Sequence, residues 1–242
     1  MERRVNGVPE IVPPGPARPI DEKLAEIPLF AALGRDGLET AVAAGLARRY
    51  GAGQIIVHQG DPGDRLFAVL EGLVKVVLTT AQGDVVVLDM LGPGETFGEL
   101  SVLDGGPRSA SVIVVETAWL FSVSRPQLLA LMRDHPALAD EFLRVLGALV
   151  RRLTERAADM VSLDLGGRLA KALLHLAAKH GESGGKVIDR AFTQSDLAAM
   201  VGASRPAVNR ALAVLAARNI ISINGRTIVL KNIAELHRRS VR

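Results

Sequence analysis

The stretch of about 27 residues over 137–163 contains no proline, and its apolar side chains recur at steps of three or four. These side chains are Phe142, Leu146, Leu149, Leu153, Ala157 and Met160. The period is that of one face of an α-helix, about 40 Å long at roughly 1.5 Å per residue. Such a helix packs along a core or pairs with a second copy, and the long stripe favours a dimer seam. A shorter helix after Ser124 is expected to stop before Pro136.

The region 52–123 carries short runs rich in Val, Leu and Ile, separated by turn residues. Glu71–Gly72 divides "LFAVLEGLVKVVL" and Gln82–Asp84 divides "VVLTTAQGDVVVLDML", so a hairpin is predicted at each position. Further turns are expected at "GDPGD" (60–64) and "GPGE" (92–95). Strands spaced by roughly ten residues, with no helices between them, predict an antiparallel barrel or double-sheet roll.

Charge is distributed unevenly along the chain. From Leu165 to Arg242 there are 13 Lys and Arg against 4 Asp and Glu, whereas the remainder has 16 against 22. An acidic first part joined to a basic last third suggests that the last third meets a polyanion. A basic solvated face is the alternative that charge alone leaves open.

The basic last third also carries the signals of two short helices at a steep angle. Thr193 is expected to cap the first helix and Ser204 the second, with Pro206 in its first turn. Gly202 suits the tight turn between them, because glycine adopts a positive φ without strain. Asn224–Gly225, between two β-rich runs, predicts a two-residue hairpin. Together these signals predict a winged helix-turn-helix.

The second of these helices would lie in the major groove of DNA. Arg205, Asn209 and Arg210 lie near its N-terminal end, where Arg can pair with guanine and Asn with adenine. The other candidate DNA contacts are Ser204 and Pro206, together with residues at the start of the first helix and in the wing that suit phosphates: Thr193, Gln194, Ser195, Asn224, Gly225 and Arg226. A helical hairpin with exposed basic residues is the alternative. The charge, the glycine turn and the wing together favour DNA binding.

The chain contains no cysteine, which excludes disulfides, thiolate zinc sites, cysteine-ligated iron–sulfur clusters and cysteine nucleophiles. His58 is expected on the surface rather than as a haem ligand, and the other histidines show no metal or triad spacing. No apolar run is long enough to span a bilayer, and the N-terminus lacks the apolar segment of a signal peptide. We therefore expect a cytoplasmic protein without metal, haem or iron–sulfur cluster, and without a membrane partner.

With these features the chain resembles the cyclic AMP receptor protein/FNR family of bacterial transcription regulators over roughly residues 25–235. The most specific segments are "FGELSVLDGGPRSAS" and "VGASRPAVNRAL…NIISINGRTIVL", and "LGGRLAKALLHLA" is also similar. The resemblance implies an α+β fold with an N-terminal antiparallel, double-stranded, jelly-roll-like β-roll, a long dimerisation helix and a C-terminal winged helix-turn-helix. The expected parts are a flexible arm (1–24), a cyclic-nucleotide-binding roll (25–136), a dimerisation helix (137–163), a hinge (164–167) and a DNA-binding domain (168–242).

The resemblance also gives roles to the "GELSVLDGGPRSAS" segment. In the nucleotide-binding members, N–H groups of a Gly-Glu-Leu turn face the ligand, the Glu accepts from the ribose 2′-hydroxyl, and a downstream Arg pairs with the cyclic phosphate. The corresponding residues here are Gly98, Glu99, Leu100 and Arg108, followed by Ser109 and Ala110. A guanidinium fork and N–H donors suit a phosphate monoanion. The alternative is an internal Glu99–Arg108 ion pair in a ligand-free roll. We favour cyclic AMP, while Ser109 beside Arg108 leaves cyclic GMP open.

The chain departs from the family at two places. Where the family has two adjacent polar residues against the base, this chain has Leu153 and Thr154, so base selectivity is expected to be looser or to pass to Arg152 or Arg156. Members that recognise TGTGA-type half-sites begin the recognition helix with Arg-Glu, but Pro206 has no acceptor for cytosine. We expect a palindromic TGTGA-like site that is relaxed at one position.

These features lead to one prediction of function. The chain is expected to be a homodimeric, sequence-specific transcription regulator, not an enzyme, controlled allosterically by a cyclic nucleotide. RNA polymerase is a further partner on family grounds, through exposed loops such as Gly181–Gly185. The alternatives are a family member with another effector, ligand-independent DNA binding, a chromosomal architectural protein and, least favoured, an enzyme that hydrolyses cyclic nucleotides.

Overall fold

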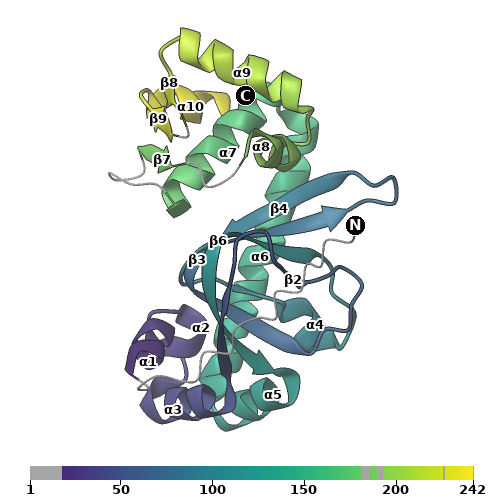
Figure 1. Cartoon of the computed structure of the whole chain (residues 1–242), viewed down its shortest axis with the longest axis vertical. Helices are drawn as coiled ribbons and strands as arrows, with labels where there is room; N and C mark the ends of the chain where they lie inside the picture. Colours follow the sequence, from purple (N-terminus) through teal and green to yellow (C-terminus); the bar gives the residue numbers. More distant parts are fainter. Residues whose placement is uncertain (1–17, 181–185, 190–192, 226, 242) are drawn as a thin grey trace, which may run out of the picture. The chain divides into compact units, whose positions relative to one another are not determined.

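The computed structural model describes residues 18–180, 186–189, 193–225 and 227–241. The chain divides into two compact units. The first unit comprises Met1–Val74 and Leu91–Leu143, and the second comprises Lys75–Met90 and Arg144–Arg242. Figure 1 gives the labels of the helices and strands.

The first unit begins with three helices: α1 (Arg18–Ala25), α2 (Pro28–Ala31) and α3 (Gly34–Ala44). They pack on one another, and α3 also packs on α5 (Arg125–Asp134). Phe30 on α2 meets Phe121 edge to face, with ring centroids 5.6 Å apart. The sequence patterns did not predict α1–α3, which are short and depend on this packing. The helix α5 agrees with the one expected to stop before Pro136.

The larger sheet is antiparallel, as predicted, and lies mainly in the first unit, whereas its segment Lys75–Met90 belongs to the second unit. Its strands are β1 (Leu46–Tyr50), β2 (Ile55–Val57), β3 (Arg65–Thr79), β4 (Val85–Leu91), β5 (Thr96–Phe97) and β6 (Ser111–Ser124). The order is β1-β6-β3-β4, with β2 paired to β6 and β5 paired to β3. The expectation that no helix lies between the strands was wrong, because α4 (Glu99–Asp104) separates β5 from β6.

The hairpin predicted at Glu71–Gly72 was also wrong. The 15-residue strand β3 runs straight through this position. Gly72 has a positive φ of 82°, and a Cβ there would lie 2.2 Å from the carbonyl oxygen of Thr117. The glycine therefore allows β3 and β6 to approach closely. In the sequence, a glycine with this role looks the same as a glycine in a turn. The hairpin at Gln82–Asp84 is confirmed, with Gly83 N–H donating to Thr80 O at 2.9 Å.

The helix α6 (Pro136–Ser162) begins in the first unit and continues from Arg144 in the second, where α7 (Leu165–His180) follows after only two residues. The side chain of Asp164 accepts a hydrogen bond of 2.7 Å from Gly167 N–H and so caps α7. The predicted hinge at 164–167 therefore lies mostly inside the first turn of α7.

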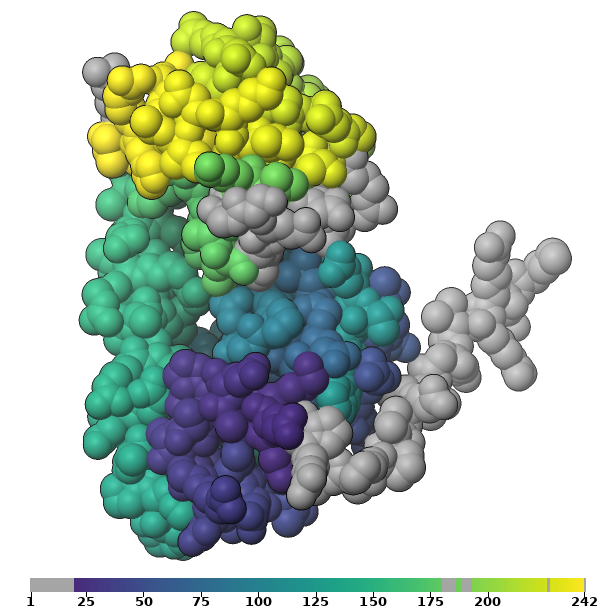
Figure 2. Space-filling model, turned by 90° about the vertical axis from the view of Figure 1, so that its left-hand side faces the viewer, coloured from purple at the N-terminus to yellow at the C-terminus, as the bar shows by residue number. Residues whose placement is uncertain are grey.

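The long helix is confirmed, but the face that it exposes differs from the predicted stripe. Phe142 is 2% exposed and Leu149 is half-buried. Among the apolar side chains at least partly open to solvent, six follow steps of three and four: Leu143, Leu146, Val150, Leu153, Ala157 and Met160. Four of them belong to the predicted stripe, with Leu143 and Val150 in place of Phe142 and Leu149. Figure 2 shows part of the surface of α6, in blue-green, uncovered by other segments. The uncovered stripe is a heptad seam, defined here as these six residues.

The C-terminal part of the second unit is a winged helix-turn-helix, as predicted. It contains β7 (Val187–Asp189), α8 (Gln194–Val201), α9 (Arg205–Ala217), β8 (Ile221–Asn224), β9 (Thr227–Leu230) and α10 (Ile233–Arg239). The strands form an antiparallel sheet in the order β7-β9-β8 (Figure 1). The core includes Leu173, Val208 and Ile228, each fully buried. None of the helices in the described ranges is long and apolar enough to cross a membrane.

Candidate functional site

The Gly-Glu-Leu segment lies at the start of α4, and its glycine is required by the surroundings. Gly98 has φ 87° and is the N-cap of α4, with Glu99 as the first helical residue. A Cβ on Gly98 would lie 2.5 Å from Nη1 of Arg108 and 2.9 Å from the carbonyl oxygen of Arg65. A side chain here would therefore be strained and would displace Arg108.

Arg108 is only 5% exposed, although it carries a charge. Its Nη1 donates to Gly98 O at 3.3 Å and its Nη2 donates to Arg65 O at 2.8 Å. Its Nε is buried and has no hydrogen-bond partner among the described residues. The guanidinium lies 5.7 Å from the centre of the Phe67 ring. The structure therefore holds a buried cation with an unused donor.

The backbone around Arg108 fixes this side chain in place. Arg108 N–H donates to Asp61 O, and its carbonyl accepts from Gly60 N–H, each at 2.8 Å. Burial lowers the pKa of Arg108, an effect that the carboxylates of Asp64, Glu99 and Asp61 oppose. Arginine still remains charged at neutral pH. A monoanionic group would meet both the charge and the unused N–H.

The structure brings some of the predicted ligand residues together and leaves others untested. The carbonyl oxygen of Gly98 accepts a hydrogen bond from Arg108, and the nearby Glu99 carboxylate opposes the lowering of the Arg108 pKa by burial. The remaining predicted residues of the first unit are Leu100 and Ser109, which are exposed, and Ala110, which is buried. Leu153 and Thr154 lie on α6 in the second unit, where both are exposed. The hydroxyl of Thr154 donates to Val150 O at 2.9 Å.

Sequence analysis missed a buried charge cluster in the second unit. Asp89 on β4 is 4% exposed, and its carboxylate lies 2.7 Å from Arg152 Nη1 and 4.0 Å from Arg156 Nη2 on α6. From α7, Lys179 Nζ approaches it to 3.4 Å and His175 Nε2 to 3.6 Å. Burial alone would raise the pKa of Asp89, but these neighbours hold it well below its usual range. Arg152 and Arg156, which the sequence suggested as possible contacts to the nucleotide base, therefore form ion pairs with Asp89.

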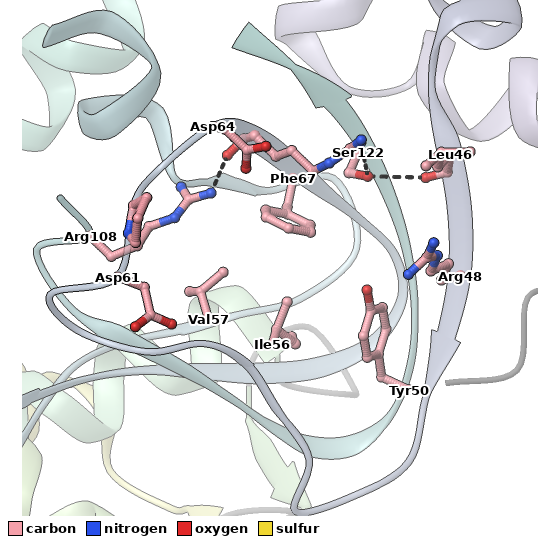
Figure 3. A pocket seen from close by; sticks show the side chains of 12 residues that line it. Leu46, Arg48, Tyr50, Ile56, Val57, Asp61, Asp64, Phe67, Arg108 and Ser122 are labelled. Atoms are coloured by element: carbon pink, nitrogen blue, oxygen red, sulfur yellow. Dashed lines mark hydrogen bonds between the residues drawn. The ribbon is translucent and has the colours of Figure 1, made fainter. Parts of the chain in front are cut away.

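A pocket of about 320 Å³ in the first unit includes Arg108 and several residues that the sequence did not single out. Figure 3 shows Arg108, Asp61 and Asp64 on one side and Arg48, Tyr50 and Ser122 on the other. Phe67, Ile56 and Val57 lie between them (Figure 3). The missed signal is the alternation in "LARRY", where Leu46, Arg48 and Tyr50 point to one side.

The caps predicted for the helix-turn-helix are present. Thr193 Oγ1 accepts from Asp196 N–H at 3.1 Å, and the Asp196 carboxylate accepts from Thr193 N–H at 2.8 Å. Ser204 Oγ accepts from Ala207 N–H at 3.4 Å. Gly202 lies in the left-handed region with φ 64°. These contacts fix the ends of α8 and α9 and so set the turn.

The predicted DNA contacts lie mainly on open surface. Arg205 and Arg210 are exposed on α9, whereas Asn209 is half-buried and its Oδ1 has no partner among the described residues. The other exposed residues of the predicted set are Ser204, Pro206, Thr193, Ser195, Asn224 and Gly225, and Gln194 is half-buried. Arg226 and Gly181–Gly185 lie outside the described residues.

Comparisons with known proteins agree with this arrangement. A family model for a cyclic nucleotide-binding domain matches residues 47–135, and one for a Crp-like helix-turn-helix domain matches residues 167–239. The chain is 34% identical over 228 residues to the CRP-like cAMP-activated global transcriptional regulator of Mycobacterium tuberculosis, covering 91% of this chain and 100% of that protein. It is 35% identical over 212 residues to the cyclic AMP receptor protein of Thermus thermophilus, covering 86% of this chain and 94% of the relative.

Solved structures give the same result. The catabolite activator protein of Thermus thermophilus matches with a TM-score of 0.51 at 33% identity, covering 88% of this chain and 98% of that one. FixK2 of Bradyrhizobium japonicum is similar in fold, with a TM-score of 0.75 at 20% identity over 82% of this chain and 98% of that one. The resemblance and the fold class predicted from the sequence are confirmed. The chain belongs to the cyclic AMP receptor protein/FNR family and is a DNA-binding transcription regulator with a cyclic nucleotide-binding domain, not an enzyme.

Proposed function

We propose that the protein is a homodimeric, sequence-specific regulator whose affinity for DNA is controlled by cyclic AMP. The observation that carries the proposal is the buried Arg108 guanidinium, with its unused Nε–H, beside the left-handed Gly98. A cyclic phosphate supplies an acceptor and a compensating charge at that place. The names of the two curated relatives, a cAMP-activated regulator and a cyclic AMP receptor protein, support cyclic AMP as the ligand.

The sugar and phosphate are proposed to bind through the first unit. Arg108 has five N–H donors, and the two carbonyl contacts use two of them. Three donors therefore remain for phosphate oxygens without breaking the existing contacts. Glu99 would accept from the ribose 2′-hydroxyl, while Leu100, Ser109 and Ala110 line the rest of the site. The sugar and the phosphate of one nucleotide would thus be held by a single segment of the chain.

Thr154 favours adenine over guanine in this scheme. Its hydroxyl proton is donated to Val150 O, so the oxygen offers only lone pairs to a ligand. The 6-amino group of adenine is a donor, whereas O6 of guanine is an acceptor that would meet another acceptor. Calorimetric titration with cyclic AMP and cyclic GMP tests this. Thr154→Ser should keep the preference, and Thr154→Val should reduce it by weakening cyclic AMP binding.

The dimer is proposed to form along the heptad seam of α6. Val150 and Met160 are 61% and 59% exposed. Exposed large apolar side chains that recur at steps of three and four form one stripe, which favours pairing with a second helix in a coiled coil. Val150→Glu would place a charge in the seam and should shift the protein from dimer to monomer in sedimentation velocity. Ala148→Glu introduces the same charge on the opposite face of α6 and should leave a dimer. A monomeric wild type at micromolar concentration would exclude this seam.

DNA recognition is proposed to rest on Arg205 and Arg210. Both are exposed on α9, and each can pair with guanine O6 and N7. Pro206 offers no acceptor to cytosine, so the TGTGA-like half-site should be relaxed at one base pair. Arg205→Ala should cost roughly 1–3 kcal/mol of binding free energy and lower specificity. Arg218→Ala, an exposed arginine at the far end of α9, is the matched control.

The control by ligand is proposed to be a population shift. Cyclic AMP would bind more tightly to the arrangement in which both recognition helices meet successive major grooves, about one DNA turn apart. A ligand that bound both arrangements equally would change nothing. The central test is fluorescence anisotropy with a palindromic TGTGA/TCACA duplex at fixed salt, with and without cyclic AMP.

The expected result is that cyclic AMP raises the affinity of the wild type at least tenfold and has no effect on Arg108→Leu. Arg49→Leu, a partly exposed arginine on β1, should respond like the wild type. If cyclic AMP changes neither protein, control by cyclic AMP is wrong. Strong binding that is independent of ligand would then assign the protein to a ligand-independent regulator, and binding without site preference to an architectural role.

A further inference from the structure

The pocket of Figure 3 has a cationic end that the proposed cyclic nucleotide site does not use. Arg48 and Tyr50 on β1 and Arg65 at the start of β3 all line this pocket. All three side chains are half-buried. Burial raises the pKa of the Tyr50 phenol, and the neighbouring guanidinium groups of Arg48 and Arg65 oppose that rise. Two guanidinium groups therefore converge on one phenol.

Neither guanidinium has a carboxylate partner in the described part of the chain. The neighbouring Arg49 differs, since it points away from this pocket and pairs with Glu71 at 3.3 Å. Like charges that share a partly buried space repel one another unless an anion lies between them. The arrangement of Arg48 and Arg65 is thus that of an anion receptor.

Ser122 holds one of these cations in position. Arg65 Nη1 donates to Ser122 Oγ at 3.3 Å, and Ser122 Oγ donates to Leu46 O at 3.4 Å. Ser122 is 8% exposed, so this relay is largely shielded from water. Arg65 retains further N–H donors that can face the pocket, and Arg48 and the Tyr50 hydroxyl add more. A tetrahedral phosphate, with three terminal oxygens, suits this number of donors better than a single halide ion.

The rest of the pocket has room for an organic group. The volume of about 320 Å³ exceeds what a phosphate alone fills. Phe67, which is stacked on Phe97 with centroids 4.9 Å apart, forms an apolar wall together with Ile56 and Val57. Asp61 and Asp64 lie beyond it as hydrogen-bond acceptors. The pocket thus has hydrogen-bond donors for a phosphate at one end, an apolar wall in the middle and carboxylate acceptors at the other end. This arrangement suits a small phosphorylated molecule with hydroxyl groups.

We propose that this pocket binds a small phosphate monoester, with its phosphate between Arg48, Arg65 and Tyr50 and its hydroxyl-bearing part toward Asp61 and Asp64. The ligand is a metabolite-sized effector of the sugar phosphate class. The site goes beyond the proposed function, because it needs no cyclic nucleotide at Arg108. Arg65 is shared by the two sites: its side chain faces this pocket while its carbonyl holds Arg108. An anion here would therefore alter the affinity for cyclic AMP.

The chain offers a selective probe for this site, because Tyr50 is its only tyrosine. Protein labelled with 3-fluorotyrosine gives a single ¹⁹F signal at the pocket. Titration with glucose 6-phosphate should shift this signal in a saturable way and move the titration midpoint of the phenol to higher pH. Glucose should have no effect, and potassium chloride at equal ionic strength should not saturate. Inorganic phosphate should bind at least threefold more weakly than the ester.

Arg48→Gln should weaken the binding of glucose 6-phosphate by about tenfold or more, as expected for a lost charge-assisted contact. Arg49→Gln is the matched control on the same strand and should stay within about twofold of wild type. Arg108→Leu should abolish binding of cyclic AMP but keep binding of glucose 6-phosphate, so that the two proposals fail separately. The proposal is overturned if the ester gives no saturable shift up to about 10 mM, which corresponds to a binding energy weaker than about 3 kcal/mol. It is also overturned if Arg108→Leu, and not Arg48→Gln, removes the shift, because the anion then belongs to the cyclic nucleotide site.

Discussion

Replacement of Asp89 by asparagine should destabilise the second unit more than any exposed substitution in the same hairpin. Asn has nearly the shape of Asp and keeps one acceptor, so the change removes the charge and little packing. It leaves Arg152, Arg156, Lys179 and His175 around a neutral group. The loss therefore measures what the buried carboxylate contributes against four basic side chains from two helices.

The magnitude follows from the burial of the partners. Breaking a fully buried ion pair typically costs about 3–5 kcal/mol, because it leaves one charge without a partner. The Asp89 side chain is 6% exposed, but its partners are between 20% and 35% exposed and stay partly hydrated. We therefore expect the free energy of unfolding to fall by about 2 kcal/mol. For a unit of roughly 100 residues this corresponds to a decrease in Tm of about 8 °C.

The dependence on pH has a definite sign. Because the pKa of Asp89 is lowered in the folded state, its contribution is fully present above the unfolded value of about 3.9. The contribution is lost as pH falls through the lower, folded value. The difference between wild type and Asp89→Asn should therefore stay constant between about pH 7 and pH 5 and narrow below about pH 4.

Thermal denaturation followed by circular dichroism measures Tm, and hydrogen exchange of the α7 amides assigns the loss to the second unit. Asp84→Asn is the matched control, because Asp84 lies exposed in the turn of the same hairpin. If Asp89→Asn melts within about 1 °C of Asp84→Asn at pH 7, the charge cluster adds nothing beyond ordinary surface pairs. A difference that grew as pH fell would refute the assigned sign.

Three further substitutions test the local geometry. Gly98→Ala should lower Tm more than Gly94→Ala, because both glycines have φ near 90° but only Gly98 would place a Cβ against Arg108; differential scanning calorimetry compares them. Gly72→Ala should cost more than about 2 kcal/mol in urea denaturation, since its Cβ would meet backbone atoms of the neighbouring strand. Thr193→Ala should cost about 1 kcal/mol by loss of the cap on α8, measured by the same denaturation with Ser195→Ala as control.

The helix-turn-helix could be predicted in detail because its signals are local. Thr193, Gly202 and Ser204 act within a few residues of their own positions, so caps and a turn could be inferred without knowledge of the rest of the fold. The long helix could be predicted for the same reason, from its period. Its exposed face could not, because the burial of Phe142 depends on what packs against it in the first unit.

The charge cluster escaped prediction because Asp89 on β4 is distant in sequence from its basic partners on α6 and α7. Asp89 is separated from Lys179 by 90 residues, and nothing in either segment refers to the other. One signal was present: in "VVVLDML" the alternation puts Asp89 on the same side of β4 as Val87 and Leu91, both buried. An acid on an apolar face needs a basic partner, so the sequence could indicate a buried pair but not the identity of the bases. The hairpin was wrongly predicted at Gly72 for a similar reason. A glycine is needed there because β6, which is distant in the sequence, packs closely against β3.

The contacts around the junction of α6 and α7 bear on how a signal reaches the DNA-binding helices. Asp164 caps α7, and Arg168 donates to Leu163 O and to Val201 O, each at 3.0 Å. Lys171 pairs with Asp159 across the junction, and Asp89 joins both helices through its four basic neighbours. Bending at 164–167 would break several of these bonds at once. The C-terminal part of α6, the tip of the β3–β4 hairpin and the winged helix are thus linked by contacts that span the predicted hinge. Under the proposed control by cyclic AMP, we therefore expect α6 and the recognition helix to move together rather than to bend at 164–167.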